Sequence, residues 1–294
     1  MVVDASRRLR MDKEHATGNV QCAVLLRGST ADTSRGGPRA QQKLGLCIGI
    51  NNYPGTSNDL AGCVNDANDW SAELRKRGFA VDTLLDKQAT KTNITNGMMG
   101  LLEKAKGDDV VVITYSGHGT WQADDDDDEP DGRDEALCPY DVSGGPLLDD
   151  ELYDIFSTRA RGTRLVFLSD SCHSGSVAKL YPEPNIERKI RFMSPVYYQP
   201  SAEKLARLRA VEKTASRGRS RSSALLISGC ADVEYSYDTS FGGRPNGAFT
   251  RVALDVLDAT NPATYRDWFS AIKKRLPSCH AESAPPAAVS NAFA

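Results

Sequence analysis

The stretch RLVFLSDSCHSGS, residues 164–176, combines an apolar run with an abrupt change of chemistry. Its first half is rich in Leu, Val and Phe and has the length of a buried β-strand. Asp170, Cys172 and His173 follow directly, and the protonation of all three side chains depends on their surroundings. The pattern therefore predicts a strand that ends at a reactive site.

The segments on both sides of this strand alternate between strand and helix patterns. Continuous apolar runs predict further strands, and apolar side chains spaced three and four residues apart predict helices. We expect strands at 43–50, 79–86, 108–116 and 223–230, and helices at 60–78, 90–107, 147–160, 247–259 and 265–276. This alternation indicates an α/β fold with a mostly parallel central β-sheet flanked by helices on both faces. In such folds the active site lies at the carboxyl ends of the strands.

The composition is that of a globular protein and argues against several classes of partner. Of the 294 residues, 40% are hydrophobic and 26% are charged, and the net charge is −3. That charge gives no reason to expect nucleic acid as a partner. The sequence lacks an apolar run of the about 18 residues that a membrane helix needs, so we expect no membrane association. Seven cysteines without a paired spacing favour a reducing, cytoplasmic location.

Several segments depart from the alternation. Residues 1–42 are polar and lack periodicity, which predicts a flexible N-terminal arm before one domain at 43–278 and a tail at 279–294. The stretch at 124–135 holds nine acids and predicts a loop. Residues 179–222 carry eleven Lys or Arg against four acids, and we interpret them as an exposed, protease-sensitive insertion.

Two of the predicted strands lead into residues that suit nucleophilic catalysis. Cys172 ends one strand, and His118 follows the strand at 108–116 between two glycines. Because the carboxyl ends of parallel strands share one edge, the two side chains are expected to meet there. A thiol is mostly protonated at neutral pH, and a neighbouring imidazole activates it. The backbone N–H groups of Gly119 and Cys172 are the expected donors to an oxyanion.

The same motifs resemble the caspase fold and, within it, the metacaspases and their bacterial relatives. The resemblance rests on YSGHG (115–119) and DSCHSG (170–175), and it extends to CIGINNY, LAGCVNDA, DEALCPYD, LLDDEL, ISGC and GAFT, roughly residues 43–276. It implies a cysteine endopeptidase with Cys172 as nucleophile and His118 as general acid and base. The QAC-type motif of caspases proper is absent from the sequence.

The resemblance also implies a substrate pocket for a basic side chain. Asp170 and Asp66 match the acidic walls of the S1 pocket, which holds the residue before the scissile bond, and Cys63 and Ser116 match its remaining lining. Two carboxylates that face one pocket favour Arg or Lys. Protein or peptide substrates are therefore expected to be cut after a basic residue, and His173 is expected to be motif scaffold.

Calcium activation and self-processing are further implications of the resemblance. Asp134, Asp149 and Asp150 match positions that bind activating calcium in similar metacaspases. Lys179 stands where a fourth acidic ligand is expected, and a cation there opposes the metal. Metacaspase-like zymogens often cut themselves after the nucleophile, so a cut after Lys or Arg within 179–222 is a natural hypothesis.

A second hypothesis keeps the fold without the activity: a catalytically weak caspase-fold scaffold or regulatory interaction protein. Lys179, which replaces an acidic residue expected by resemblance, supports this second hypothesis. The presence of both Cys172 and His118 favours the enzyme. By resemblance to metacaspases, we expect a monomer.

Overall fold

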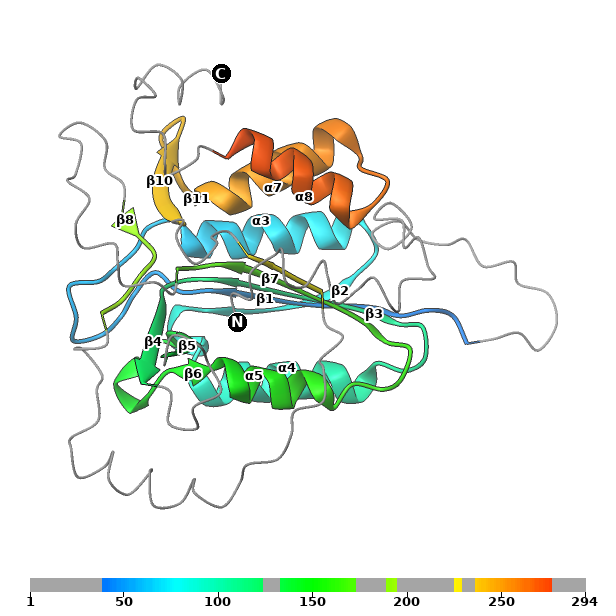
Figure 1. Ribbon diagram of the computed structural model, residues 1–294, viewed down its shortest axis with the longest axis horizontal. Coiled ribbons are helices and arrows are strands. Elements are labelled where there is room, and N and C mark those ends of the chain that lie inside the picture. Colours follow the sequence, from blue (N-terminus) through cyan, green and yellow to red (C-terminus); the bar gives the residue numbers. More distant parts are fainter. Residues whose placement is uncertain (1–38, 124–132, 173–188, 195–224, 229–235, 277–294) are drawn as a thin grey trace.

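A five-stranded parallel β-sheet forms the centre of the protein (Figure 1). The structure is a computed structural model and describes residues 39–123, 133–172, 189–194, 225–228 and 236–276. The strand order is β2–β1–β3–β7–β9, and all four pairings are parallel. The strands are β1 (Lys43–Gly49), β2 (Ala80–Leu85), β3 (Val110–Ser116), β7 (Arg164–Asp170) and β9 (Leu225–Ser228). The predicted α/β fold with a mostly parallel sheet is confirmed.

Helices cover both faces of this sheet (Figure 1). One face carries α3 (Cys63–Lys76), α7 (Ala248–Thr260) and α8 (Tyr265–Arg275), and the other carries α4 (Lys91–Lys104) and α5 (Asp149–Ser157). Local chemistry sets several helix ends: Thr90 caps α4, Thr264 caps α8, and Asn261 adopts the left-handed conformation that ends α7. Because apolar side chains from both faces of the sheet meet these helices, the core forms two layers.

Two small antiparallel sheets lie beyond the carboxyl ends of the central strands. One has the order β4–β5–β6 and consists of β4 (Gly119–Ala123), β5 (Arg133–Leu137) and β6 (Leu147–Leu148). The other has the order β11–β10–β8 and consists of β8 (Lys189–Ile190), β10 (Tyr237–Phe241) and β11 (Arg244–Gly247). Short 3₁₀ turns at Asp86–Gln88 and Val142–Gly144 complete the described elements. The edge where an active site was expected is therefore lined by added strands.

Three boundaries differ from the sequence prediction. Residues 133–135, which were expected to belong to a loop, are part of β5. Residues 39–42 were expected to be flexible, but the Arg39 guanidinium and the Gln42 N–H both donate to the Asp109 carboxylate at 2.7 Å. Within the predicted exposed insertion, the described residues include Arg191 and Met193, which are 0% exposed. The prediction of exposure is wrong at these two positions, because Arg191 has buried charge partners and Met193 packs in the core. Residues 1–38 and 277–294 lie outside the described ranges. Of the predicted insertion at 179–222, only 189–194 are described.

Within the described ranges, none of the helices combines the length and the hydropathy needed to cross a membrane.

Candidate active site

Cys172 and His118 occupy equivalent positions after adjacent strands. The register of the sheet pairs Ser116, the last residue of β3, with Asp170, the last residue of β7. Each of the two candidate catalytic residues follows its strand at the second position. Cys172 is 0% exposed and His118 is 3% exposed. The sheet therefore places both residues at one edge, as the sequence predicts, and the site is closed to solvent.

Two tyrosine hydroxyls, which sequence reasoning missed, hold the backbone of His118. The His118 N–H donates to the Tyr53 hydroxyl at 2.8 Å, and the Tyr115 hydroxyl donates to the His118 carbonyl at 2.7 Å. Gly117 leaves room for them, because a Cβ at this position would lie 2.7 Å from both hydroxyl oxygens. The Tyr53 ring also packs against the imidazole, with 4.9 Å between ring centroids. The backbone and ring of His118 are thus fixed by packing before any substrate binds.

The hydrogen bond of the imidazole selects its tautomer. Nε2 of His118 lies 2.6 Å from the carbonyl oxygen of Asn58, which can only accept, so Nε2 carries the proton. Nδ1 is then the basic nitrogen, and it makes no hydrogen bond to the described residues. Burial lowers the pKa of His118 from 6.5 to about 4, against the opposing effect of the Asn58 carbonyl. At neutral pH the imidazole is uncharged and able to accept a proton.

The thiol of Cys172 and its backbone N–H contact two different residues. The Ser236 N–H donates to Sγ at 2.7 Å, and Sγ lies 3.3 Å from the Ser236 carbonyl. The backbone N–H of Cys172 donates to the carbonyl oxygen of Arg191 at 3.1 Å, and the N–H of Gly119 donates to the same oxygen at 2.9 Å. The two N–H groups that the sequence nominated as oxyanion donors therefore converge on one carbonyl oxygen.

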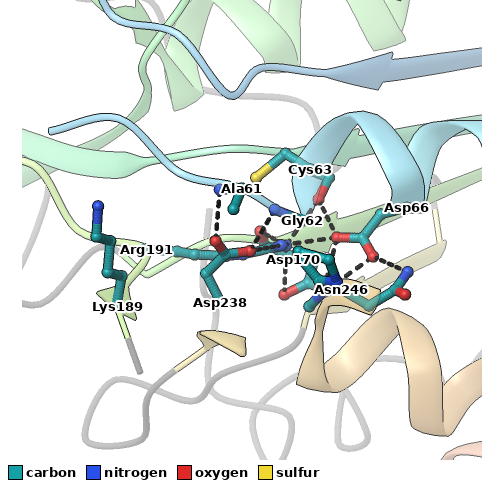
Figure 2. A network of polar contacts seen from close by, with 12 residues as sticks. Ala61, Gly62, Cys63, Asp66, Asp170, Lys189, Arg191, Asp238 and Asn246 are labelled. Atoms are coloured by element: carbon teal, nitrogen blue, oxygen red, sulfur yellow. Dashed lines mark hydrogen bonds and ion pairs between the residues drawn. The ribbon is translucent and has the colours of Figure 1, made fainter. Parts of the chain in front are cut away.

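The guanidinium of Arg191 fills a pocket of carboxylates (Figure 2). Nη2 lies 2.7 Å from Asp66 and 3.0 Å from Asp238, and Nη1 lies 3.1 Å from Asp170. Nη1 also donates to the Ser116 hydroxyl at 2.7 Å. We call Asp66, Ser116, Asp170 and Asp238 the Arg191 pocket. Three of its members were predicted as S1 lining, whereas Asp238 and Arg191 itself were not.

The carboxylates of the Arg191 pocket are held by the first turns of two helices. Asp238 accepts the N–H groups of Ala61 at 2.6 Å and of Gly62 at 2.9 Å, where α3 begins. Asp170 accepts the N–H of Thr250 in the first turn of α7 at 2.9 Å. Asp66 accepts the N–H of Gly247, the residue before α7, at 2.9 Å. Helix N-termini stabilise negative charge, so these backbone N–H groups help to keep the pocket's own aspartate side chains in the charged form.

The charges of the Arg191 pocket do not balance. Burial alone would lower the pKa of Arg191, but the facing Asp170, Asp66 and Asp238 outweigh burial and raise that pKa well above its ordinary value. Burial raises the pKa of Asp66, and Arg191 acts in the opposite direction. Three carboxylates surround one cation, so the pocket without its guanidinium would hold uncompensated buried negative charge.

Cys63, the remaining residue of the predicted pocket lining, lies at the start of α3 and is 0% exposed. Burial raises the pKa of its thiol well above the ordinary value, and the nearby Arg191 opposes that effect. Cys63 is therefore a neutral wall of the pocket.

The predicted calcium ligands lie apart from the catalytic edge, at the small sheet β4–β5–β6. Asp134 is on β5, and Asp149 and Asp150 are the first residues of α5, which follows β6. Asp134 and Asp149 are 7% and 6% exposed. In the described part of the chain, no three His, Cys, Asp or Glu side chains gather closely enough to hold a metal ion. Lys179 and residues 124–132 lie outside the described ranges.

Comparison with known proteins identifies the family to which the chain belongs. A family model for the caspase domain matches residues 42–291. The chain belongs to the caspase-domain family. It is 30% identical to Metacaspase-1 of Saccharomyces cerevisiae over 271 residues, which is 79% of this chain and 62% of the yeast protein. It is 34% identical to Metacaspase-3 of Arabidopsis thaliana over 239 residues, 77% of this chain and 62% of the plant protein.

A solved structure supports the same conclusion for the fold. The crystal structure of a Geobacter sulfurreducens protein superimposes with a TM-score of 0.65 at 34% identity, covering 80% of this chain and 89% of that chain. The caspase-domain member described here thus spans about 62% of the length of the yeast and plant metacaspases that it matches.

The buried imidazole predicts a pH dependence of stability. The pKa of His118 is about 4 in the folded chain and near 6.5 in the unfolded chain, so the unfolded chain binds the extra proton between these values. This contribution to stability is present above pH 6.5 and is lost as the pH falls toward 4, by about 3 kcal/mol. Urea denaturation of Cys172→Ala and of Cys172→Ala/His118→Gln, at pH 7 and pH 4, measures it. The double variant is expected to lose about 3 kcal/mol less, and equal losses would show that His118 is not buried in its neutral form.

Proposed function

We propose that this chain is a cysteine endopeptidase that cuts peptide bonds after arginine and, less efficiently, after lysine. One observation carries the proposal. The residue whose guanidinium fills the Arg191 pocket is the same residue whose carbonyl oxygen receives the N–H groups of Gly119 and Cys172. The pocket therefore selects the side chain of the residue whose carbonyl lies at the nucleophile, which is the position that determines specificity in an endopeptidase.

The proposed chemistry uses groups that the fold has already oriented. Nδ1 of His118 accepts the proton of the Cys172 thiol, and the sulfur attacks the carbonyl carbon of the basic residue. The N–H groups of Gly119 and Cys172 bind the oxygen as it becomes negative. His118 then gives its proton to the leaving amine, and water hydrolyses the thioester.

The shape of the Arg191 pocket favours arginine over lysine. The two terminal nitrogens of the Arg191 guanidinium contact different members of the pocket. Nη1 lies next to Ser116 and Asp170, and Nη2 lies next to Asp66 and Asp238. A planar guanidinium serves both sides at once, whereas an ammonium has a single nitrogen. A lysine side chain therefore makes fewer of the charge-assisted hydrogen bonds than an arginine does. An acidic side chain would be repelled by all three carboxylates.

We also propose that calcium activates the enzyme, and the support for this is the chemistry of the possible ligand side chains. Asp134, Asp149 and Asp150 offer the hard oxygen atoms that calcium prefers, but the described residues supply fewer donors in one place than the about six to eight it takes. The described residues do not by themselves make the site. No step of the proposed mechanism passes through the metal. The cytoplasmic location and the monomeric state stay predictions from the sequence.

Reporter peptides that differ only at the residue before the scissile bond test the specificity. We expect the highest kcat/KM for Arg, a value roughly tenfold lower for Lys because about one charge-assisted contact is lost, and background for Asp. Cys172→Ala is expected to abolish hydrolysis of all three peptides. Preferential cutting after Asp would contradict the pocket assignment, and full activity of Cys172→Ala would contradict the nucleophile.

Gly247→Ala tests whether the Arg191 pocket is the substrate pocket. A Cβ at residue 247 would overlap Nη1 of the bound guanidinium and an oxygen of Asp170, and it would lie 2.7 Å from Cζ. Overpacking costs about 1–3 kcal/mol, so kcat/KM for the Arg peptide is expected to fall roughly 10- to 100-fold. Gly100→Ala on α4 meets no atom within 4 Å and serves as the matched control. Equal activity of the two variants would place the substrate elsewhere.

Calcium dependence is tested on α5. We expect calcium to raise peptide hydrolysis by the wild type and a chelator to remove the gain. Asp150→Asn is expected to raise the calcium concentration for half activation about tenfold or more by removing a charged ligand. Asp154→Asn, an exposed position on the same helix, is expected to leave it unchanged. Calcium titration calorimetry of the three proteins gives a readout independent of activity, and wild-type activity unaffected by chelation would contradict the proposal.

A further inference from the structure

The loop between β1 and α3 holds His118 at several points. The Tyr53 hydroxyl accepts the His118 N–H at 2.8 Å, and the Tyr53 ring packs against the imidazole. The carbonyl oxygen of Asn58 lies 2.6 Å from Nε2. These contacts reach the backbone, the ring face and the Nε2 nitrogen of a single residue, and they all come from the short stretch 53–58.

A tight turn sets the position of Asn58 relative to Tyr53. The sequence Tyr-Pro-Gly-Thr at 53–56 has proline and glycine at the central positions that a type II turn prefers, and Gly55 has the positive φ, 75°, that this turn requires. The Thr56 N–H closes the turn on the Tyr53 carbonyl at 3.1 Å. The Thr56 hydroxyl donates to the same carbonyl at 2.8 Å and accepts the Asn58 N–H at 3.1 Å. Tyr53 and Asn58 thus belong to one hydrogen-bonded unit.

The start of this loop is fixed by carboxylates. The N–H groups of Asn51 and Asn52 donate to the Asp86 carboxylate at 2.7 and 3.0 Å. The Tyr53 N–H donates to the Asp59 carboxylate at 2.9 Å, and the Tyr53 side chain is 1% exposed. Connecting segments normally have fewer such ties and are more mobile. A loop tied in this way keeps its shape, so it holds His118 rather than following it.

We propose that Tyr53 is a positioning residue for His118. Its hydroxyl holds the His118 backbone, and the turn that it begins places the Asn58 carbonyl at Nε2. The inference rests on the proposed peptidase activity and deepens it, because it names a residue on which the general base depends. Nε2 keeps its proton on the Asn58 carbonyl, while Nδ1 accepts the proton of the Cys172 thiol and later gives it to the leaving amine.

Loss of the Tyr53 hydroxyl is expected to displace the imidazole rather than to remove a substrate contact. The His118 N–H would lose its acceptor in a buried position, and a buried donor without a partner is costly enough to shift the backbone that carries it. A displacement of about 1 Å at a catalytic group lowers a rate by up to about 100-fold. The members of the Arg191 pocket come from other elements, so substrate affinity is expected to stay near its wild-type value.

Two pairs of variants test this role. Tyr53→Phe removes the hydroxyl and keeps the ring. Tyr153→Phe on α5 is its matched control, because the Tyr153 hydroxyl makes no hydrogen bond to the described residues. Thr56→Val removes the hydroxyl that joins Tyr53 to Asn58, at a half-buried loop position where the change is not expected to unfold the chain. Thr56→Ser keeps that hydroxyl and is the conservative counterpart.

Hydrolysis of the Arg reporter peptide separates positioning from binding. Tyr53→Phe is expected to lower kcat about 10- to 100-fold with KM within about twofold of the wild type. Thr56→Val is expected to lower kcat about three- to tenfold, in line with the loss of about one hydrogen bond, and Thr56→Ser to recover most of that loss. Tyr153→Phe is expected to match the wild type. A kcat of Tyr53→Phe within about twofold of the wild type, or a loss confined to KM, would overturn the inference.

The protonation of the two ring nitrogens gives a readout that does not depend on activity. Nitrogen NMR of isotope-labelled histidine is recorded on Cys172→Ala and on Cys172→Ala/Tyr53→Phe, and His118 is assigned by the loss of its signals in Cys172→Ala/His118→Gln. We expect a protonated Nε2 and an unprotonated Nδ1 in the first protein, and exchange-averaged signals of both tautomers in the second. Partial unfolding alone would weaken the folded signals without averaging them.

The outcomes separate the inference from the proposed function. Peptide hydrolysis with an unchanged kcat in Tyr53→Phe, or an unchanged His118 tautomer in Cys172→Ala/Tyr53→Phe, would overturn the inference and leave the proposed function standing. Absence of peptide hydrolysis by the wild type would overturn the proposed function itself, and the NMR comparison would still decide whether Tyr53 orients the imidazole.

Discussion

The ion cluster of Arg191 with Asp66, Asp170 and Asp238 is the interaction on which the catalytic edge depends. Each carboxylate comes from a different element, α3, β7 or β10, and the cation follows β8 directly. Removing a buried cation from such a cluster leaves charges that the interior cannot solvate, which costs about 3–5 kcal/mol in comparable pairs. The cluster therefore joins the added sheet β11–β10–β8 to the central one.

The backbone groups at the same edge follow from the strand register. Because Ser116 is opposite Asp170, the chain leaves β3 and β7 at the same level, and the N–H groups of Gly119 and Cys172 end up on one carbonyl oxygen. The pocket, the two N–H donors and the pairing with β10 are thus fixed relative to one another by a rigid sheet. A small displacement of either strand would separate the carboxylates that hold the Arg191 guanidinium from the N–H groups that hold its carbonyl oxygen.

Sequence reasoning reached the sheet and the residues at its strand ends because these follow from local patterns. The apolar runs predicted β3 and β7, and the second residue after each strand is His118 and Cys172, respectively. It missed Asp238, which binds the N–H of Ala61 across 177 residues of sequence, because no local pattern marks such a contact. No local sequence pattern marks Tyr53 and Tyr115 as partners of His118, yet their hydroxyls position its backbone. Arg191 was one of eleven basic residues in a stretch without periodicity, and only the fold distinguishes it.

The excess of negative charge explains why the Arg191 guanidinium occupies the pocket. Three buried carboxylates without a cation are a high-energy arrangement, relieved by taking up a proton or by binding a base; the raised pKa of Asp66, which burial causes even beside Arg191, is in keeping with this. Arg191 belongs to the same chain as the pocket and is therefore present at high effective concentration. It binds the three carboxylates in preference to a free base. Under the proposed function, a substrate arginine displaces it with a group of the same charge and shape. The features on which the proposed selectivity for arginine rests are therefore the same features that hold the chain's own arginine in place.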